Sequence, residues 1–330
     1  MAFALIELSL RVFYPPPVRF FYPQEFYDFD HEMGHTLRPG QTAFTHDRPV
    51  QTNSLGLRDR EVGPNPTAGT LRVLALGDSQ TFGNGLSLSD TWPKQLERRL
   101  QQVHNIRCEV INAGIPGTDT WQHEILLARL LKATNPHVVV LALYVNDVVP
   151  RHDPRTGSAA GQTNTWNKRL LYLLKRSALV TWIYHDLLVP WQARRFEHGS
   201  SVEEDVLAGR RTDRAERGWR QVEGSLTAMK KLTDARGVTL LVAMLPRRDQ
   251  VSGNHPGRAF GERARDIAEA HGITAVDLLP SLSERYRRSG DALFIPWDGH
   301  NSAVANEVIA ERLAARLEGP LQSPSPRAAP

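Results

Sequence analysis

The chain of 330 residues contains a single cysteine, Cys108, which excludes an intramolecular disulfide framework and a cysteine-based zinc site. Long apolar runs are also missing: the longest, 138–145, is far shorter than the roughly 20 residues that cross a bilayer as a helix. No run of five like charges occurs, and the net charge is only +4. With 41% hydrophobic and 23% charged residues, the composition is that of a globular protein with a sizeable core.

The charge is unevenly distributed along the chain. Residues 151–195 carry eight Lys or Arg against two Asp, a net of +6, so the other 285 residues total −2. This basic stretch is too local for the broad basic face that nucleic-acid binding requires, and we expect no nucleic-acid partner. Its cations alternate with aromatic side chains. They form either the solvated face of a helical cap or a surface that meets an anionic membrane or an acidic glycan.

The two ends of the chain differ from its body. Residues 1–13 are apolar apart from Glu7, Ser9 and Arg11, and they lack the basic start and small-residue cleavage site of a signal peptide. They predict either an amphipathic helix packed on the body or the remnant of a membrane anchor. Residues 319–330 contain four prolines and little to bury, which predicts a disordered tail.

The body shows a regular alternation of predicted strands and helices after an N-terminal arm, 14–70, that is rich in Pro, Tyr and Phe. We expect strands over 71–76, 108–111, 138–143, 238–245 and 274–276, and helices over 90–102, 119–132, 213–235, 261–270 and 302–317. Asp90 is the expected N-cap of the first of these helices. The alternation predicts an α/β domain over 71–318 with a central parallel sheet covered on both faces, interrupted by a helical insertion or cap over 151–212.

Polar segments follow the predicted strands, at the sheet edge where open parallel sheets bind ligands. These segments are 77–83, 112–118 and 144–147, and a fourth, 297–301, stands just before the last helix. Together they supply a hydroxyl, a glycine amide, a carboxamide, and a carboxylate beside an imidazole. Each segment alone is more typical of an ordinary turn or cap. In combination they indicate a serine hydrolase, with a nucleophile, oxyanion donors and an oriented base.

These segments resemble the sequence blocks of the SGNH (GDSL-type) hydrolase superfamily, over most of the chain from about residue 53 to 317. The resemblance implies a three-layer α/β/α, flavodoxin-like fold, with Ser79 as nucleophile, His300 as base and Asp298 as the acid that orients it. The Gly-x-Ser-x-Gly elbow of the α/β-hydrolases is absent around Ser79, which argues against that fold.

The resemblance also implies an oxyanion hole formed by Ser79, Gly117 and Asn146, with Gly117 a better candidate than Gly114. It implies no metal and no organic cofactor. His31 and His35 have the spacing of a metal-binding pair, but they lie in the irregular arm without a third ligand, so we predict no metal there.

The sequence departs from the superfamily pattern at two positions. Tyr144 stands where the third block usually has glycine, which changes the wall beside Asn146. Asp298 stands two residues before His300 instead of three, a spacing that resembles a subset related to the alginate acetyltransferases. Because residues i and i+2 of an extended segment point the same way, the carboxylate can reach the imidazole only if this segment precedes the last helix.

The N-terminal region resembles a bacterial subgroup in which a membrane-anchoring helix precedes an arm like residues 38–40 and 53–59. This implies a membrane-associated domain on the exported, periplasmic side. The function implied is a serine esterase that hydrolyses acyl or acetyl esters of small molecules or glycans, carbohydrate O-deacetylation included. Two alternatives remain: an O-acyltransferase acting on a cell-envelope polysaccharide with the same Ser/His machinery, and a binding module that has lost catalysis.

Overall fold

The computed structural model of the chain describes residues 2–13, 26–45, 48–149, 177–183, 202–255, 257–295 and 299–321. The strands are β1 Tyr27–Asp30, β2 Gly34–Leu37, β3 Thr42–Thr45, β4 Arg48–Gln51, β5 Leu71–Gly77, β6 Cys108–Gly114, β7 Val138–Leu143, β8 Thr239–Met244 and β9 Thr274–Asp277. The α-helices are α1 Ala2–Phe13, α2 Ser79–Phe82, α3 Trp92–Gln102, α4 Thr120–Thr134, α6 Ala178–Trp182, α8 Val202–Leu207, α9 Asp213–Asp234, α10 Arg248–Ser252, α11 Ala259–Ala270, α12 Leu279–Ser289 and α13 Ala303–Leu321. Short 3₁₀ turns are η1 Leu88–Asp90, η2 Val145–Val148 and η5 Gly290–Leu293.

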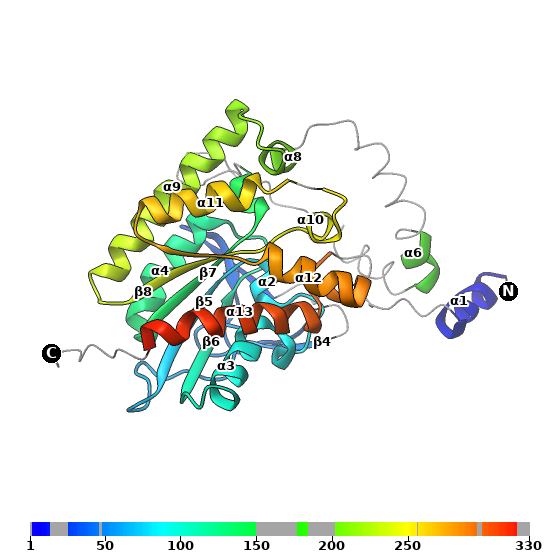
Figure 1. The fold of residues 1–330 in the computed structure, drawn as a ribbon. Helices are drawn as coiled ribbons and strands as arrows, with labels where there is room; N and C mark the ends of the chain where they lie inside the picture. The colour runs from blue at the N-terminus through cyan, green and yellow to red at the C-terminus, as the bar shows by residue number, and fades with distance from the viewer. Residues whose placement is uncertain are drawn as a thin grey trace.

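The central sheet contains β6-β5-β7-β8-β9 in that spatial order, and every neighbouring pair is parallel (Figure 1). Counted by appearance along the chain, the order is 2-1-3-4-5, which is the flavodoxin-like order. The order reverses between β5 and β7, so a crevice is expected beyond the carboxyl ends of these two strands. Ser79 follows β5 directly and Asn146 follows β7, so both lie at this switch point.

Helices cover both faces of the sheet because side chains of each strand alternate between two apolar cores. Leu74 and Leu76 of β5 lie in the core formed with α4, α9 and α11, whereas Val73 and Ala75 lie in the core formed with α3, α12 and α13. All six residues of β7 are buried, as expected of a central parallel strand. The predicted three-layer α/β/α fold is confirmed.

The N-terminal arm forms two antiparallel hairpins, β1–β2 and β3–β4, in its described part. It packs on the α4 side of the sheet, where Met33, Leu37, Val50 and Leu57 are buried in the same core as the strands. Each of these strands has only four residues, so the alternation of buried and exposed side chains is too short to predict the hairpins from sequence. The arm is therefore an integral part of the domain's core.

Helix α1 lies beside α6 (Figure 1), and none of its side chains is buried. Glu7 accepts hydrogen bonds from the amides of Ala178 (2.8 Å) and Leu179 (3.1 Å) and from the hydroxyl of Ser177 (2.8 Å). Partial desolvation by α6 opposes ionisation of the half-exposed Glu7, but these hydrogen bonds outweigh it and lower its pKa to about 2. Among the described residues, no helix is both long and apolar enough to cross a membrane.

Two sequence-based expectations about helix ends are corrected by the structure. Asp90 ends η1, and Thr91 is the N-cap of α3, whose first turn contains Pro93. The last helix continues to Leu321, so the first three residues of the predicted tail, 319–321, are helical. The rest of that tail and most of the insertion, 151–176 and 184–201, lie outside the described residues.

Gly114 lets the end of β6 approach α2, the helix that begins with Ser79. A Cβ at this position would lie 2.1 Å from the backbone nitrogen of Phe82, and helix backbone cannot yield as a flexible side chain can. We therefore expect Gly114→Ala to displace α2, to lower the free energy of unfolding by about 3 kcal/mol or more, and to reduce esterase activity.

Urea unfolding and turnover of p-nitrophenyl acetate would measure both effects. The matched control is Gly224→Ala in α9, where nothing lies within 4 Å of an added Cβ. That control should stabilise the protein by about 0.5–1 kcal/mol, because alanine loses less conformational entropy in a helix than glycine. A Gly114→Ala protein with wild-type stability would contradict the close packing of β6 against α2.

Candidate active site

Ser79 lies at the first position of α2, in the tight turn that follows β5. Asp78 is the N-cap of this helix, and its Oδ1 accepts a hydrogen bond from the amide of Gln80 (2.9 Å). Gly83 ends the helix in the left-handed conformation, at φ 83°. The sequence Gly-Asp-Ser therefore produces a capped single turn that presents the Ser79 hydroxyl at the carboxyl edge of the sheet.

His300 reaches Ser79 from a segment 221 residues further along the chain. Its Nε2 lies 2.8 Å from Ser79 Oγ, within the range required of a general base. A backbone bridge between Phe294 and Asn301 holds this segment, and the amide of Asn301 donates to Gln80 Oε1 (3.1 Å). The nucleophile turn and the histidine segment are thus bonded to each other at two points.

Three groups that could stabilise an oxyanion border this pair. Asn146 Nδ2 donates one hydrogen to Asp78 Oδ2 (3.0 Å), which leaves its second hydrogen for a ligand. The amide of Ser79, at the first helical position, has no intrahelical acceptor. Gly117, at φ 79°, likewise has no acceptor for its amide within the described residues, whereas the amide of Gly114 donates to Asn112 Oδ1 (3.0 Å).

Two adjacent residues of the N-terminal arm hold the loops of this site. Arg58 is 1% exposed and donates to the carbonyl oxygens of Phe82 (2.8 Å) and Gly83 (2.7 Å), at the end of α2. Burial lowers the pKa of Arg58 to about 10, so it stays charged at neutral pH. Asp59 Oδ2 accepts from the amide of Asn112 (2.8 Å), two residues before the carboxyl end of β6. The arm therefore supports both sides of the site.

A buried polar network lies behind the loop that contains Gly117. The Thr118 hydroxyl donates its single proton to the carbonyl of Ile115 (2.7 Å), so the Nε2 of His123 must donate to Thr118 (2.9 Å). Burial lowers the pKa of His123 to about 3, so this imidazole is neutral. Asp147 accepts from the Thr120 hydroxyl (2.9 Å), and burial raises its pKa. The network fixes the start of the helix that follows the Gly117 loop.

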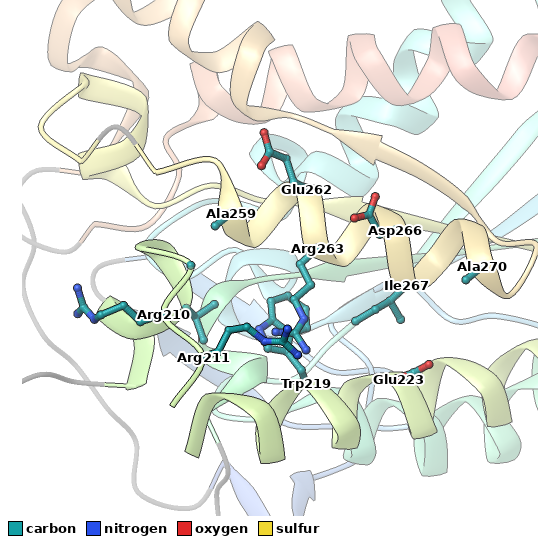
Figure 2. A pocket seen from close by; sticks show the side chains of 12 residues that line it. Arg210, Arg211, Trp219, Glu223, Ala259, Glu262, Arg263, Asp266, Ile267 and Ala270 are labelled. Carbon is teal, nitrogen blue, oxygen red and sulfur yellow. The ribbon is translucent and has the colours of Figure 1, made fainter. Parts of the chain in front are cut away.

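A groove of about 570 Å³ between α9 and α11 is distinct from this site (Figure 2). Its arginines are already engaged: Arg263 pairs with both oxygens of Glu216 (2.7 Å each), and Arg211 contacts the same carboxylate (3.0 Å). Trp219, beneath the Arg263 guanidinium, is only 3% exposed. These contacts tie α9 to α11, and we interpret the groove as structural.

The structure brings together Ser79, His300, Asn146 and the 112–118 loop, whereas Asp298 lies outside the described residues. Within those residues, no group of three or more potential metal ligands occurs. Sequence reasoning missed the supporting roles of Arg58, Asp59 and Asp78. Of these three residues, only Asp78 could be recognised from its neighbours in the sequence, because an Asp two residues before a backbone amide is typical of a helix N-cap.

Comparison with known proteins gives the family of the chain. The sequence model of the GDSL-like Lipase/Acylhydrolase family matches residues 75–303. The chain is 31% identical over 110 residues to the probable alginate O-acetylase AlgJ of Pseudomonas aeruginosa, a match that covers 31% of this chain and about a quarter, 27%, of that relative's length.

Solved structures with a similar fold include the lipase/acylhydrolase from Enterococcus faecalis, with a TM-score of 0.42, 15% identity, and coverage of 78% of this chain and all of that one. An acetyl xylan esterase has a TM-score of 0.46, 16% identity, and coverage of 75% and 100%. The family match alone spans more than two thirds of the sequence. The chain belongs to the GDSL-like lipase/acylhydrolase family.

Proposed function

We propose that this enzyme is a serine esterase that cleaves acyl or acetyl esters through a covalent acyl-enzyme on Ser79. The contact of 2.8 Å between Ser79 Oγ and His300 Nε2 carries the proposal. A serine hydroxyl is a weak nucleophile until an adjacent base removes its proton, and the imidazole is placed to do so. We assign the three candidate donors to the negative charge that develops on the carbonyl oxygen.

In the first step, His300 Nε2 takes the Ser79 proton as Oγ forms a bond to the ester carbonyl carbon. The electron pair of the carbonyl moves onto its oxygen, which is stabilised by the amides of Ser79 and Gly117 and by the side chain of Asn146. Collapse of this intermediate breaks the bond to the alcohol, which leaves with the proton from His300. Water then repeats the sequence on the acyl-enzyme and releases the acid.

We assign Asp298 the role of orienting His300 through Nδ1, as the resemblance implies. Such a carboxylate selects the tautomer in which Nε2 is free to accept the Ser79 proton, and it stabilises the imidazolium that forms.

For the substrate, we propose an O-acetylated carbohydrate. A second candidate is transfer of the acyl group to a polysaccharide hydroxyl in place of water, which the similarity to the probable alginate O-acetylase favours. Both reactions use the same acyl-enzyme. They differ in whether an acceptor hydroxyl or water attacks it.

A panel of p-nitrophenyl esters, assayed with and without a polysaccharide acceptor, would test the proposal. An esterase should release p-nitrophenol fastest from short acyl chains and leave the acceptor unmodified by mass spectrometry. Acceleration by the acceptor, with acetyl groups found on it, would establish the transferase. No turnover of any ester by folded protein would contradict both and favour a binding module.

A further inference from the structure

We infer that His35 of the N-terminal arm is a positioning residue for the oxyanion hole, acting on the peptide that joins Pro116 to Gly117. The inference rests on the proposed function, since it takes the Gly117 amide as an oxyanion donor. His35 stands in β2, far from the catalytic segments in sequence. Nothing in its sequence surroundings marks it as part of the site.

The decisive contact is between His35 Nε2 and the carbonyl oxygen of Pro116, at 3.0 Å. That carbonyl and the Gly117 N–H belong to the same planar peptide unit and point in opposite directions. Holding the carbonyl therefore fixes the direction of the N–H. The ring also lies against Gly117, since a Cβ built there would be 3.9 Å from His35 Cε1 and Nε2.

The position of one hydrogen on the His35 ring follows from this contact. A carbonyl oxygen only accepts, so Nε2 must carry a hydrogen and donate it. A donor on the carbonyl polarises the peptide and makes its N–H a stronger donor in turn, because hydrogen bonds in series reinforce one another. His35 would thus both direct and strengthen the oxyanion donor.

His35 is held in place by the docking of its hairpin on α4. Met33 is fully buried, and its carbonyl accepts from Gln122 Nε2 (2.6 Å). Arg129 of α4 pairs with Asp30 (2.7 Å), a contact that holds the pKa of this carboxyl well below its usual range. The imidazole packs edge-on against Tyr27, with ring centroids 5.4 Å apart. The hairpin is therefore a rigid support for this single hydrogen bond.

The arm precedes the matched family region, which begins at residue 75. The Gly117 loop lies within that region, but the group that holds its peptide comes from outside it. The oxyanion hole of this chain is therefore completed by a segment that precedes the matched region.

The test compares His35→Phe, which keeps an aromatic ring but removes the donor, with His35→Gln, which keeps an N–H donor. We expect His35→Phe to lower kcat by about 10- to 100-fold with KM within about twofold, because losing an oxyanion donor outright costs about 10²–10³. His35→Gln should recover most of the loss. The control is His31→Phe on the same hairpin, which should leave kcat unchanged because His31 contacts Phe29 and not the loop.

A second readout separates positioning from a general structural effect. Thionoesters develop charge on sulfur, which accepts hydrogen bonds weakly, so their turnover depends less on the oxyanion hole. The ratio of p-nitrophenyl acetate to p-nitrophenyl thionoacetate turnover should therefore fall in His35→Phe. This ratio is independent of the fraction of folded enzyme.

The possible results distinguish a failure of the His35 inference from a failure of the proposed esterase function. An unchanged ratio, or a kcat of His35→Phe within twofold of wild type, would overturn the role of His35 while leaving the esterase proposal intact. So would a His35→Gln enzyme as impaired as His35→Phe. Retained activity in Ser79→Ala would overturn the proposed function, and this inference with it.

Discussion

Replacing Ser79 with alanine is expected to lower kcat/KM for p-nitrophenyl acetate by about 10³-fold or more, because no other group can form the acyl-enzyme. The Ser79 hydroxyl contacts His300 Nε2 at the carboxyl edge of the sheet and fills no part of the apolar core. The free energy of unfolding should therefore change little. Steady-state kinetics and urea unfolding of the same preparations would measure both quantities.

Ser87 provides a matched control, since it lies in the same loop region, at the N-cap of η1, without a side-chain capping bond. Ser87→Ala should retain wild-type kinetics. Mass spectrometry of the wild type treated with a fluorophosphonate should place the adduct on Ser79. A Ser79→Ala enzyme with more than about a tenth of wild-type turnover would show that the nucleophile is misassigned, since loss of a catalytic serine costs far more.

The sheet and its covering helices could be predicted from sequence because their residues are patterned by burial. The predicted bounds 138–143 coincide with β7, whose residues are all buried and all apolar. Helix α12 was missed because its apolar face is short: Leu279, Leu282 and Tyr286 follow helical spacing, but only Leu282 is fully buried. The predictions thus succeed for elements in which many side chains are buried together. They fail for elements whose placement depends on a few contacts.

The supports of the active site could not be predicted for a different reason. Arg58 and His35 both donate to main-chain carbonyl oxygens, 24 to 25 and 81 residues away. Because every residue has a backbone carbonyl, the residue that accepts such a hydrogen bond cannot be recognised by its type in the sequence. The nucleophile, the base and Asn146 could be assigned because their chemistry requires particular side chains. The residues that support these side chains need only a hydrogen-bond donor at the right position, which several residue types can supply.

The acid of the proposed triad is best tested by comparing two substitutions. His300→Ala should lower kcat/KM by about 10³-fold or more, because the base that activates Ser79 is lost. If Asp298 orients His300, Asp298→Asn should be nearly as severe, since the amide favours the wrong imidazole tautomer. The corresponding change in a serine protease costs about 10⁴.

If Asp298 makes no contact with His300, asparagine should replace it with little loss of kcat/KM. Capping of the last helix is not its role, because α13 begins at Ala303 and the Ser302 hydroxyl accepts from the amide of Ala305 (3.3 Å). The informative quantity is therefore the ratio of the two defects, measured as kcat/KM on one substrate. Thermal unfolding of both variants is the control for an indirect effect through α13. An Asp298→Asn enzyme within about threefold of wild type, beside an inactive His300→Ala, would reject the triad acid. The catalytic unit would then be a Ser79–His300 dyad, with the imidazole held by the backbone bridge between Phe294 and Asn301.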